Sequence, residues 1–367
     1  MKRPIRFALI GCGRIIKNHA AAIIETPDAS LVGVSDLDPQ RMEAAARQWD
    51  VPGYLNYHDL IRDQAPDVVG ILTPSGMHPA HVIDVINRYR VHVSVEKPMA
   101  LSAHDLQAIE TCASHAGVTV FPVYQNRYNR AVQFVRSAIA SGVLGKLVLG
   151  TARVRWSRGQ QYYDRDPWRG TWAMDGGALT NQGIHYLDLL QYLGGDISWV
   201  RARTATSLVS VEVEDTALGM LGFHNGALGA IEVTTAARPR DFEAEISLLC
   251  EKGTVILGGL ACNEIRTFTP DESQASIHSE DFPDAYGFGH WPFYSDVVSQ
   301  CQRRGDHPIS FVEGCKAVRL LNALYRSAET QADVRLDGDV ASSRLGTPDR
   351  RLASLYTSVP SGERHEP

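Results

Sequence analysis

The feature that most constrains the fold of this chain is a glycine turn between an apolar segment and a helix-like one. Residues 5–10 are largely apolar and lead directly into Gly11-Cys12-Gly13, after which a helix-like stretch begins. This order predicts the first βαβ unit of a nucleotide-binding sheet, where the first glycine permits a tight turn and the second lets a pyrophosphate approach the helix amides. Ile16 stands where a third small residue is usual, and an isolated G-x-G pair fits an ordinary glycine-rich turn equally well.

The first third of the chain repeats the alternation of apolar strands and helix-like stretches. Such alternation is typical of an α/β fold with a doubly wound parallel sheet. Beyond 5–10, we predict strands at 31–35, 67–72, 91–96 and 118–121, with helices that include 39–49 and 102–115.

Asp36 follows the second predicted strand, close to the spacing of about 20 residues at which a carboxylate binds a ribose 2′-hydroxyl. A carboxylate there would repel a 2′-phosphate, so the pattern favours NAD over NADP. The alternative is a solvated acid at the end of a strand.

The pattern changes after residue 121. A predicted helix at 131–141 is followed by long β-rich segments, and Asn225-Gly226 has the turn chemistry of a hairpin. Ser310 and Glu313 have capping-box spacing, so a helix is expected from there to about residue 330. We therefore expect domains at 1–121 and 122–330, and an extension at 331–367 that lies on the surface or is disordered. The β-rich segments are 146–156, 200–209, 215–223, 227–235 and 244–257.

Composition excludes several classes of function. The 367 residues include 36 basic and 42 acidic side chains, a net charge of -6, so no broad nucleic-acid surface is expected. No segment approaches the roughly 20 apolar residues that cross a bilayer. Six scattered cysteines without a Cys-x-x-Cys pair indicate reduced thiols in a cytoplasmic protein. His78 and His81 have no third ligand at a suitable spacing, so no metal is expected.

Two strand ends carry candidate chemistry. The third strand leads into residues 73–78 and the fourth into Glu96-Lys97-Pro98, and both segments should face the ligand crevice at the carboxyl edge of the sheet. A lysine at such a place can stabilise a developing alkoxide. The alternative is a surface lysine paired with Glu96.

A third group of polar residues lies at 181–188. On a helix, Asn181, His185 and Asp188 share one face. His185 is the natural general base, because its ordinary pKa lies near neutral pH, and Asp188 could orient its ring. A buried structural histidine is the alternative.

These residues together carry a resemblance. The glycine turn, Asp36, Glu96-Lys97-Pro98 and Gly183-x-His185-x-x-Asp188 resemble the Gfo/Idh/MocA oxidoreductase family, in order over residues 5–330. The resemblance implies an N-terminal Rossmann domain and a C-terminal α+β domain whose large open mixed sheet builds homodimers or homotetramers. It also implies NAD as the cofactor, and oxidation of a sugar or cyclitol hydroxyl with Lys97 and His185 as catalytic residues.

The residues expected to bind NAD lie in the glycine turn and at the strand ends: Gly11, Gly13, Arg14, Ile15, Asp36, Thr73, Ser75, His78, Glu96, Lys97 and Gln125. The residues expected to bind substrate are Lys97, Arg158, Tyr163, Arg169, Asn181 and His185.

A narrower resemblance covers the second half. Residues 160–164, 168–172, 175–178, 181–182, 185–188 and 286–290 are similar to UDP-N-acetylglucosaminuronate 3-dehydrogenases, which act on the route to bacterial surface-polysaccharide sugars. Asn181 stands where the wider family often has Asp, which favours hydroxyl binding over proton relay. The resemblance implies oxidation of the 3-hydroxyl of a UDP-sugar, with 2-oxoglutarate as a candidate oxidant for recycling NADH in place. A free sugar or inositol as substrate, and a non-catalytic NAD-binding regulator, are the alternatives.

The arginines of one stretch suit such a substrate. Planar guanidinium groups bind phosphate and carboxylate, and the aromatic side chains among them can stack on a uracil or sugar. A salt-bridged hairpin is the alternative, because Asp164 and Asp166 lie in the same stretch. The arginines are Arg153, Arg155, Arg158, Arg165 and Arg169, and the aromatic residues are Trp156, Tyr162, Tyr163 and Trp168.

Overall fold

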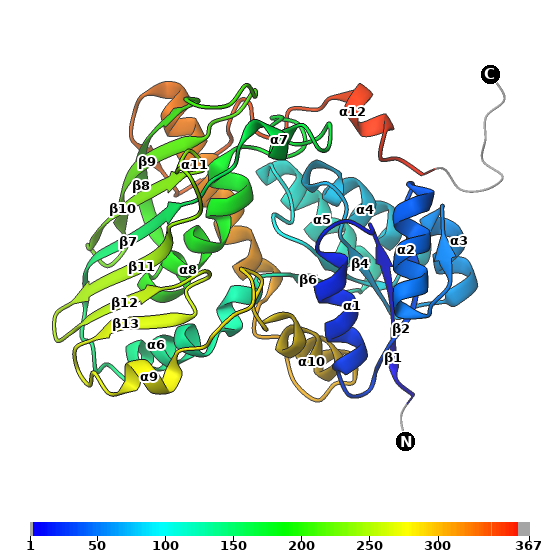
Figure 1. Cartoon of the computed structure of the whole chain (residues 1–367), viewed down its shortest axis with the longest axis horizontal. Coiled ribbons are helices and arrows are strands. Elements are labelled where there is room, and N and C mark those ends of the chain that lie inside the picture. The colour runs from blue at the N-terminus through cyan, green and yellow to red at the C-terminus, as the bar shows by residue number, and fades with distance from the viewer. Residues whose placement is uncertain (1–2, 339, 359–367) are drawn as a thin grey trace.

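The computed structural model describes residues 3–338 and 340–358 and contains two sheets side by side (Figure 1). The first is six-stranded and wholly parallel, in the order β3-β2-β1-β4-β5-β6. Its strands are β1 (Ile5–Ile10), β2 (Ala29–Ser35), β3 (Gly53–Tyr54), β4 (Val68–Ile71), β5 (His92–Val95) and β6 (Val120–Pro122). This order confirms the predicted Rossmann sheet.

Local sequence explains these elements. The valines of β4 and β5 are fully buried, as in strands covered on both faces. Asp38 caps the helix α2 through the amides of Gln40 and Arg41, and Pro39 occupies its first turn. The helices of this half are α1 (Ile16–Glu25), α2 (Pro39–Trp49), α3 (Tyr57–Gln64), α4 (His78–Tyr89) and α5 (Ala103–Ala116).

The second sheet is eight-stranded and mixed, in the order β13-β12-β11-β7-β10-β9-β8-β14. Strands β7 and β10 are parallel, and the other neighbours are antiparallel. Helices cover one face and leave the other open (Figure 1). The strands are β7 (Leu147–Arg155), β8 (Ile197–Ala205), β9 (Thr216–Phe223), β10 (Leu228–Thr234), β11 (Glu243–Cys250), β12 (Thr254–Gly258), β13 (Glu264–Phe268) and β14 (Val334–Arg335). The covering helices include α6 (Arg130–Ala140), α8 (Ile184–Gly194), α9 (Gln274–His278) and α11 (Phe311–Thr330).

The predictions of a hairpin turn and of a helix cap are confirmed. Asn225-Gly226 joins the antiparallel strands β9 and β10, with Gly226 at φ +89°. Ser310 caps α11 by accepting a hydrogen bond from the amide of Glu313. The β-rich segment expected at 244–257 forms the hairpin of β11 and β12, because residues 251–253 turn the chain.

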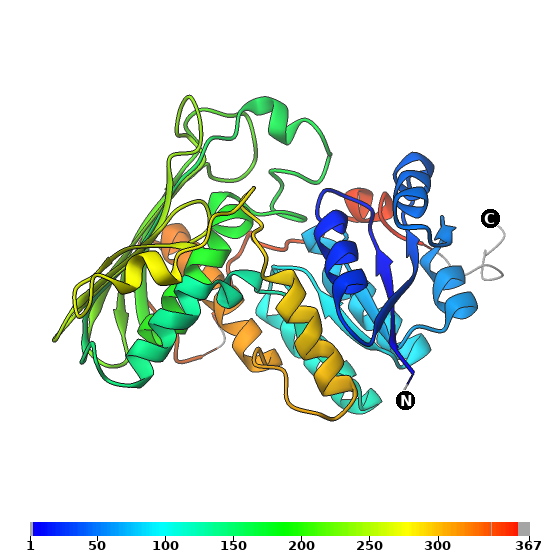
Figure 2. The same ribbon diagram turned by 60° about the horizontal axis from the view of Figure 1, so that its bottom comes forward.

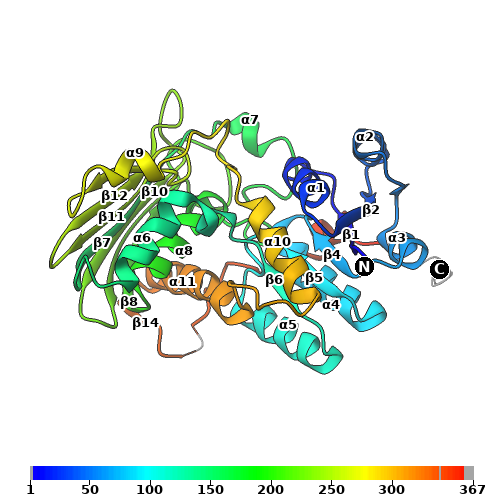
Figure 3. The same ribbon diagram turned by 90° about the horizontal axis from the view of Figure 1, so that it is seen from below.

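One helix of the second half packs on the first. Helix α10 (His290–Cys301) lies beside α1 (Figures 2 and 3). Its Phe293, Tyr294 and Val297 are buried in one cluster with Phe7 and Ile23 of the Rossmann half. A helix beyond residue 122 therefore completes the core of the nucleotide-binding half, and we keep 1–121, 122–330 and 331–367 as a proposed division.

The expected extension is partly structured. Leu345 is buried in the core of the second half, and α12 (Arg350–Ser354) follows it. Residues 359–367 of the extension lie outside the described residues. Within the described part of the chain, no helix is both long and apolar enough to cross a membrane.

Candidate active site

The glycine turn has the shape that a dinucleotide requires. Gly11 has φ +102°, and an added Cβ would lie 2.7 Å from the oxygen of Leu72, so only glycine fits there. An added Cβ on Gly13 would meet no described atom within 4 Å, so its backbone is open to a ligand. No side chain caps the start of α1 at Ile15, which leaves helix amides for a phosphate. These residues fit NAD.

Asp36 lies beside this turn, as predicted. Its carboxylate accepts hydrogen bonds from the amide of Cys12 at 2.7 Å and from the amide of Asp38 at 2.8 Å. These contacts fix the carboxylate at the end of β2, where a ribose hydroxyl would reach it.

The segment after β4 forms one wall of the crevice. His78 is buried, and its ring nitrogens lie 2.7 Å from the oxygen of Pro98 and 2.8 Å from that of Thr73. It therefore joins two strand-end segments rather than offering an atom to a ligand. Ser75 is also buried. The amide oxygen of Gln125 is buried without a partner among the described residues, so it can receive a ligand donor.

Glu96 is held by a buried hydrogen-bond chain. Its Oε1 lies 2.9 Å from His19 Nε2, and the other ring nitrogen of His19 lies 2.7 Å from the hydroxyl of Tyr294. Burial acts to raise the pKa of Glu96, but the hydrogen bond from His19 and the neighbouring His290 keep it well below its usual value. This chain fixes the end of β5.

Lys97 points across to the second half of the chain. Its Nζ donates a 2.9 Å hydrogen bond to the main-chain oxygen of Asn181, and burial lowers its pKa. The contact with Glu96 is made by the Lys97 amide at 3.1 Å, not by the ammonium group. The side chain is therefore directed into the site rather than paired on the surface.

Residues 179–183 form a π-helical turn before α8, so the regular helix expected at 181–188 is broken. His185 Nδ1 is buried without a hydrogen-bond partner among the described residues. Burial first, and then the charge of Lys97, lower the pKa of His185 to about 3, so the ring is neutral at pH 7.

The expected orienting role of Asp188 is wrong. Its carboxylate pairs instead with Arg127, whose Nη2 and Nε donate at 2.6 and 2.8 Å. Both side chains are almost fully buried. A buried guanidinium requires an anionic partner, and Asp188 supplies it inside the core.

Asp175 is a site residue that the list of expected residues omits. It is 1% exposed and accepts hydrogen bonds from the Gly170 amide at 2.9 Å and from the side-chain amide of Asn181. Burial raises its pKa to about 6. The residue lies in an irregular segment without periodicity, and its only signal in the sequence is its place before Gly176-Gly177.

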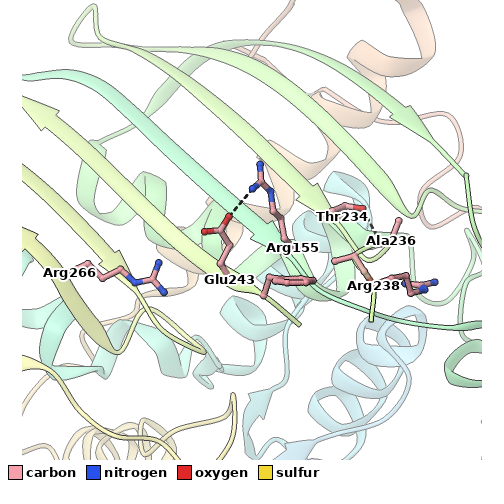
Figure 4. A pocket seen from close by; sticks show the side chains of 8 residues that line it. Arg155, Thr234, Ala236, Arg238, Glu243 and Arg266 are labelled. Carbon is pink, nitrogen blue, oxygen red and sulfur yellow. Dashed lines mark hydrogen bonds and ion pairs between the residues drawn. The ribbon is translucent and has the colours of Figure 1, made fainter. Parts of the chain in front are cut away.

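The predicted arginine stretch divides between two places. Arg153 and Arg155 lie on the open face of the second sheet and pair with Glu245 and Glu232. Figure 4 shows Arg155 in a pocket that Glu243 and Arg266 also line, and the volume of this pocket is about 580 Å³. For these two arginines the salt-bridged alternative is correct.

The other arginines follow β7 in the loop that leads to Asn181. Arg169 Nη1 donates to the hydroxyl of Tyr162 at 2.7 Å, and that hydroxyl lies 3.5 Å from Asn181 Oδ1. Arg158 pairs with Asp241 at 2.9 Å, and its guanidinium lies over the rings of Trp156 and Tyr162. Arg165 is exposed.

Tyr163 is buried, with its hydroxyl 3.2 Å from that of Thr235. Its partner therefore lies within the second half of the chain, whereas the hydroxyl of the neighbouring Tyr162 lies 3.5 Å from Asn181 Oδ1.

A dinucleotide crevice with a lysine and a histidine at its inner end defines an NAD-dependent dehydrogenase. Residues 5–124 match the family model of an oxidoreductase with an NAD-binding Rossmann fold, and residues 132–256 match the GFO/IDH/MocA C-terminal domain. The chain belongs to the GFO/IDH/MocA family of oxidoreductases. It oxidises a CH–OH group with NAD.

Three proteins illustrate what this chain is similar to. The WlbA dehydrogenase of Bordetella pertussis, solved with NADH and UDP-GlcNAcA, is 37% identical, with a TM-score of 0.87 over 92% of this chain and 99% of that one. A D-apiose dehydrogenase of Rhizobium rhizogenes is 26% identical over 64% of this chain and 67% of its own. A myo-inositol 2-dehydrogenase of Thermotoga maritima is 24% identical over 91% of this chain and 99% of its own.

Proposed function

We propose that the protein oxidises the 3-hydroxyl of a UDP-linked N-acetylglucosaminuronic acid to the 3-keto sugar, in the biosynthesis of bacterial surface-polysaccharide sugars. The likeness to the WlbA dehydrogenase carries this proposal, because it extends over nearly the whole of both chains and that protein was solved with NADH and UDP-GlcNAcA. The arrangement of Lys97, Asn181 and His185 supports the chemistry.

The catalytic roles follow from charge and burial. NAD, when bound along Gly11, Gly13 and Asp36, supplies the acceptor for the hydride. His185 is neutral and takes the hydroxyl proton, while the Lys97 ammonium stabilises the alkoxide. Burial lowers the pKa of both side chains, but the charges of Glu96 and Asp175 favour the ammonium form of Lys97, whereas the charge of Lys97 further favours the neutral form of His185. Asn181, fixed by Asp175, orients the sugar hydroxyl.

The loop after β7 binds the anionic parts of the substrate. Arg158 and Arg169 are assigned to the diphosphate and the carboxylate, and Tyr162 and Trp156 lie within stacking distance of Arg158. Tyr163 supports this loop from inside through Thr235.

Binding of free UDP to the NADH-loaded protein tests the substrate class. Calorimetry should show UDP binding that weakens about tenfold in Arg169→Ala, since a charge-assisted hydrogen bond is lost. Arg201→Ala, which breaks an ion pair to Asp333 at the edge of the second sheet, is the control. Failure of UDP to bind would favour a free sugar or inositol, the substrates named for the apiose and inositol relatives.

The open face of the second sheet is proposed to form a homodimer or homotetramer. Leu218, Met220 and Leu228 are each more than half exposed there, which is costly for a lone chain in water. Light scattering on the eluted protein should give a mass of two or four chains, and Met220→Lys should lower it. The six cysteines are free thiols, which supports a cytoplasmic location. We retain 2-oxoglutarate as the proposed oxidant that recycles NADH.

A further inference from the structure

One ion pair joins the two halves of the chain at the adenosine end of the crevice. Arg41 on α2 donates from Nη2 to Asp166 Oδ1 at 3.0 Å. Arg41 follows Asp36 and Asp38, and the charge of Asp36 acts on it, so the pair lies beside the carboxylate assigned to the NAD ribose. Asp166 belongs to the loop after β7 that also carries Arg158 and Arg169.

The same carboxylate continues toward the catalytic residues. Asp166 Oδ2 accepts from Arg169 Nε at 3.1 Å, and Arg169 contacts Tyr162, which lies next to Asn181. The main-chain oxygen of Asn181 in turn holds Lys97. An unbroken series of polar contacts therefore runs from the adenosine end of the crevice to the catalytic lysine.

The main chain crosses the same gap a second time. Leu345 is buried in the second half of the chain, and the amide of Gly346 donates to the oxygen of Trp172 at 2.9 Å. Beyond α12, the oxygen of Tyr356 lies 3.1 Å from His81 Nε2, in the Rossmann half. Figure 1 shows α12 above the gap between α7 (Gln160–Tyr163) and the first sheet. The extension thus spans the gap near the Arg41–Asp166 pair.

Asp166 and Arg41 are suited to a contact that opens and closes. The Arg41 side chain is 50% exposed and that of Asp166 17%, so water can replace either partner. Elsewhere at this edge the loop is tied down by buried groups, such as Asp175 on the Gly170 amide. The Arg41 pair thus holds the part of the loop around Asp166 to the Rossmann half, and the Gly76 amide holds the loop further along, at the oxygen of Met174.

We propose that Asp166 is a positioning residue that holds the loop after β7 closed over the adenosine end of bound NAD, and so sets how fast the dinucleotide leaves. Release requires the Arg41–Asp166 contact to separate, because the pair lies on the ribose side of the crevice. Slow release keeps NADH in place between half-reactions. The proposal goes beyond the substrate assignment and needs no sugar to be tested.

The test measures NADH release directly. Purified protein loaded with NADH is mixed with excess NAD, and the fall of NADH fluorescence gives the dissociation rate. Asp166→Asn and Arg41→Gln should each speed release about fivefold to tenfold, since the contact no longer has to break before the dinucleotide leaves. The double variant should be no faster than either single one. Asp166→Glu should keep most of the slow rate.

The control is Asp28→Asn, which breaks the exposed pair of Asp28 with Arg304 at 3.2 Å, outside the crevice. Its release rate should equal that of the unaltered protein. Raising the salt concentration should speed release from the unaltered protein but not from Asp166→Asn.

Two results would overturn the proposal. One is unchanged release in both Asp166→Asn and Arg41→Gln while their melting temperatures stay normal. The other is additive acceleration in the double variant, which would mean that the two residues act separately. A faulty substrate assignment would leave all of these rates unaffected, so the two proposals fail independently.

Discussion

The ammonium group of Lys97 lies 2.9 Å from the main-chain oxygen of Asn181. Lys97 follows β5 in the first sheet, and Asn181 lies in the π-helical turn before α8 in the second half of the chain. The turn exposes this oxygen because its residues depart from the regular hydrogen bonding of an α-helix. Two distant parts of the sequence thus place one cation beside His185.

We expect Lys97→Met and His185→Asn each to lower kcat by about 10²- to 10⁴-fold, the usual contribution of a proton-transferring or charge-stabilising group. NADH binding, measured by fluorescence titration, should change less than about threefold, because neither change alters the glycine turn. His104→Asn is the control, since the His104 side chain is 92% exposed. Near-normal turnover in either variant would show that the substituted residue does not have the catalytic role assigned to it.

Asp36→Asn should change the choice of cofactor. The neutral amide no longer repels a 2′-phosphate and loses part of its hydrogen bonding to the ribose. We expect the ratio of the Kd for NADP to that for NAD to fall at least about tenfold. Asp38→Asn, which alters the cap of α2 and the exposed pair of Asp38 with Arg41, should leave that ratio unchanged. An equal ratio of the two Kd values in both variants would show that Asp36 does not determine the choice between NAD and NADP.

The Arg127–Asp188 pair should contribute to the free energy of unfolding rather than to the action of His185 as a base. Asp188→Asn removes the closer of two carboxylates that face the buried guanidinium of Arg127, and Glu313 remains at 3.3 Å, so the loss of unfolding free energy should be at most about 3–5 kcal/mol. Denaturant titration measures this loss. The pH dependence of kcat in the folded fraction should not change. A shifted pH profile would indicate that Asp188 does orient the ring of His185, contrary to the observed contacts.

Glu214 should make stability depend on pH. It is 3% exposed, and burial raises its pKa from 4.5 to about 7. The folded state therefore binds a proton more tightly than the unfolded state, and its stability falls as pH rises from about 4.5 through 7. Glu214→Gln should be more stable than the unaltered protein by up to about 3 kcal/mol at pH 8, with this advantage lost near pH 4.5. Glu212→Gln, an exposed neighbour, should show no such dependence. A pH-independent difference would contradict the raised pKa.

Much of the first sheet follows from sequence because its signals are local. The buried runs at β4 and β5 and the turn at Gly11 each depend on a few adjacent residues. Lys97 could be placed for the same reason, since the carboxyl edge of a parallel sheet is its ligand edge.

The rest depends on contacts between distant residues. The π-helical turn is held by Glu214, which accepts hydrogen bonds from the amide of Leu179 and the hydroxyl of Tyr325. Asp188 faces Arg127 only because a segment far away in the sequence places a guanidinium in the core. Helix α10 likewise lies against the Rossmann half because its apolar side chains pack with residues that are distant in the sequence. Periodicity carries none of this information.

The most direct test of the account is mass spectrometry of UDP-N-acetylglucosaminuronic acid after incubation with the protein and NAD, with and without 2-oxoglutarate. We predict a nucleotide sugar lighter by two hydrogens, and no such product with His185→Asn. Multiple turnovers that require 2-oxoglutarate would establish recycling in place. An unchanged nucleotide sugar, together with oxidation of a free sugar or inositol by the same NAD-loaded protein, would contradict the proposed substrate.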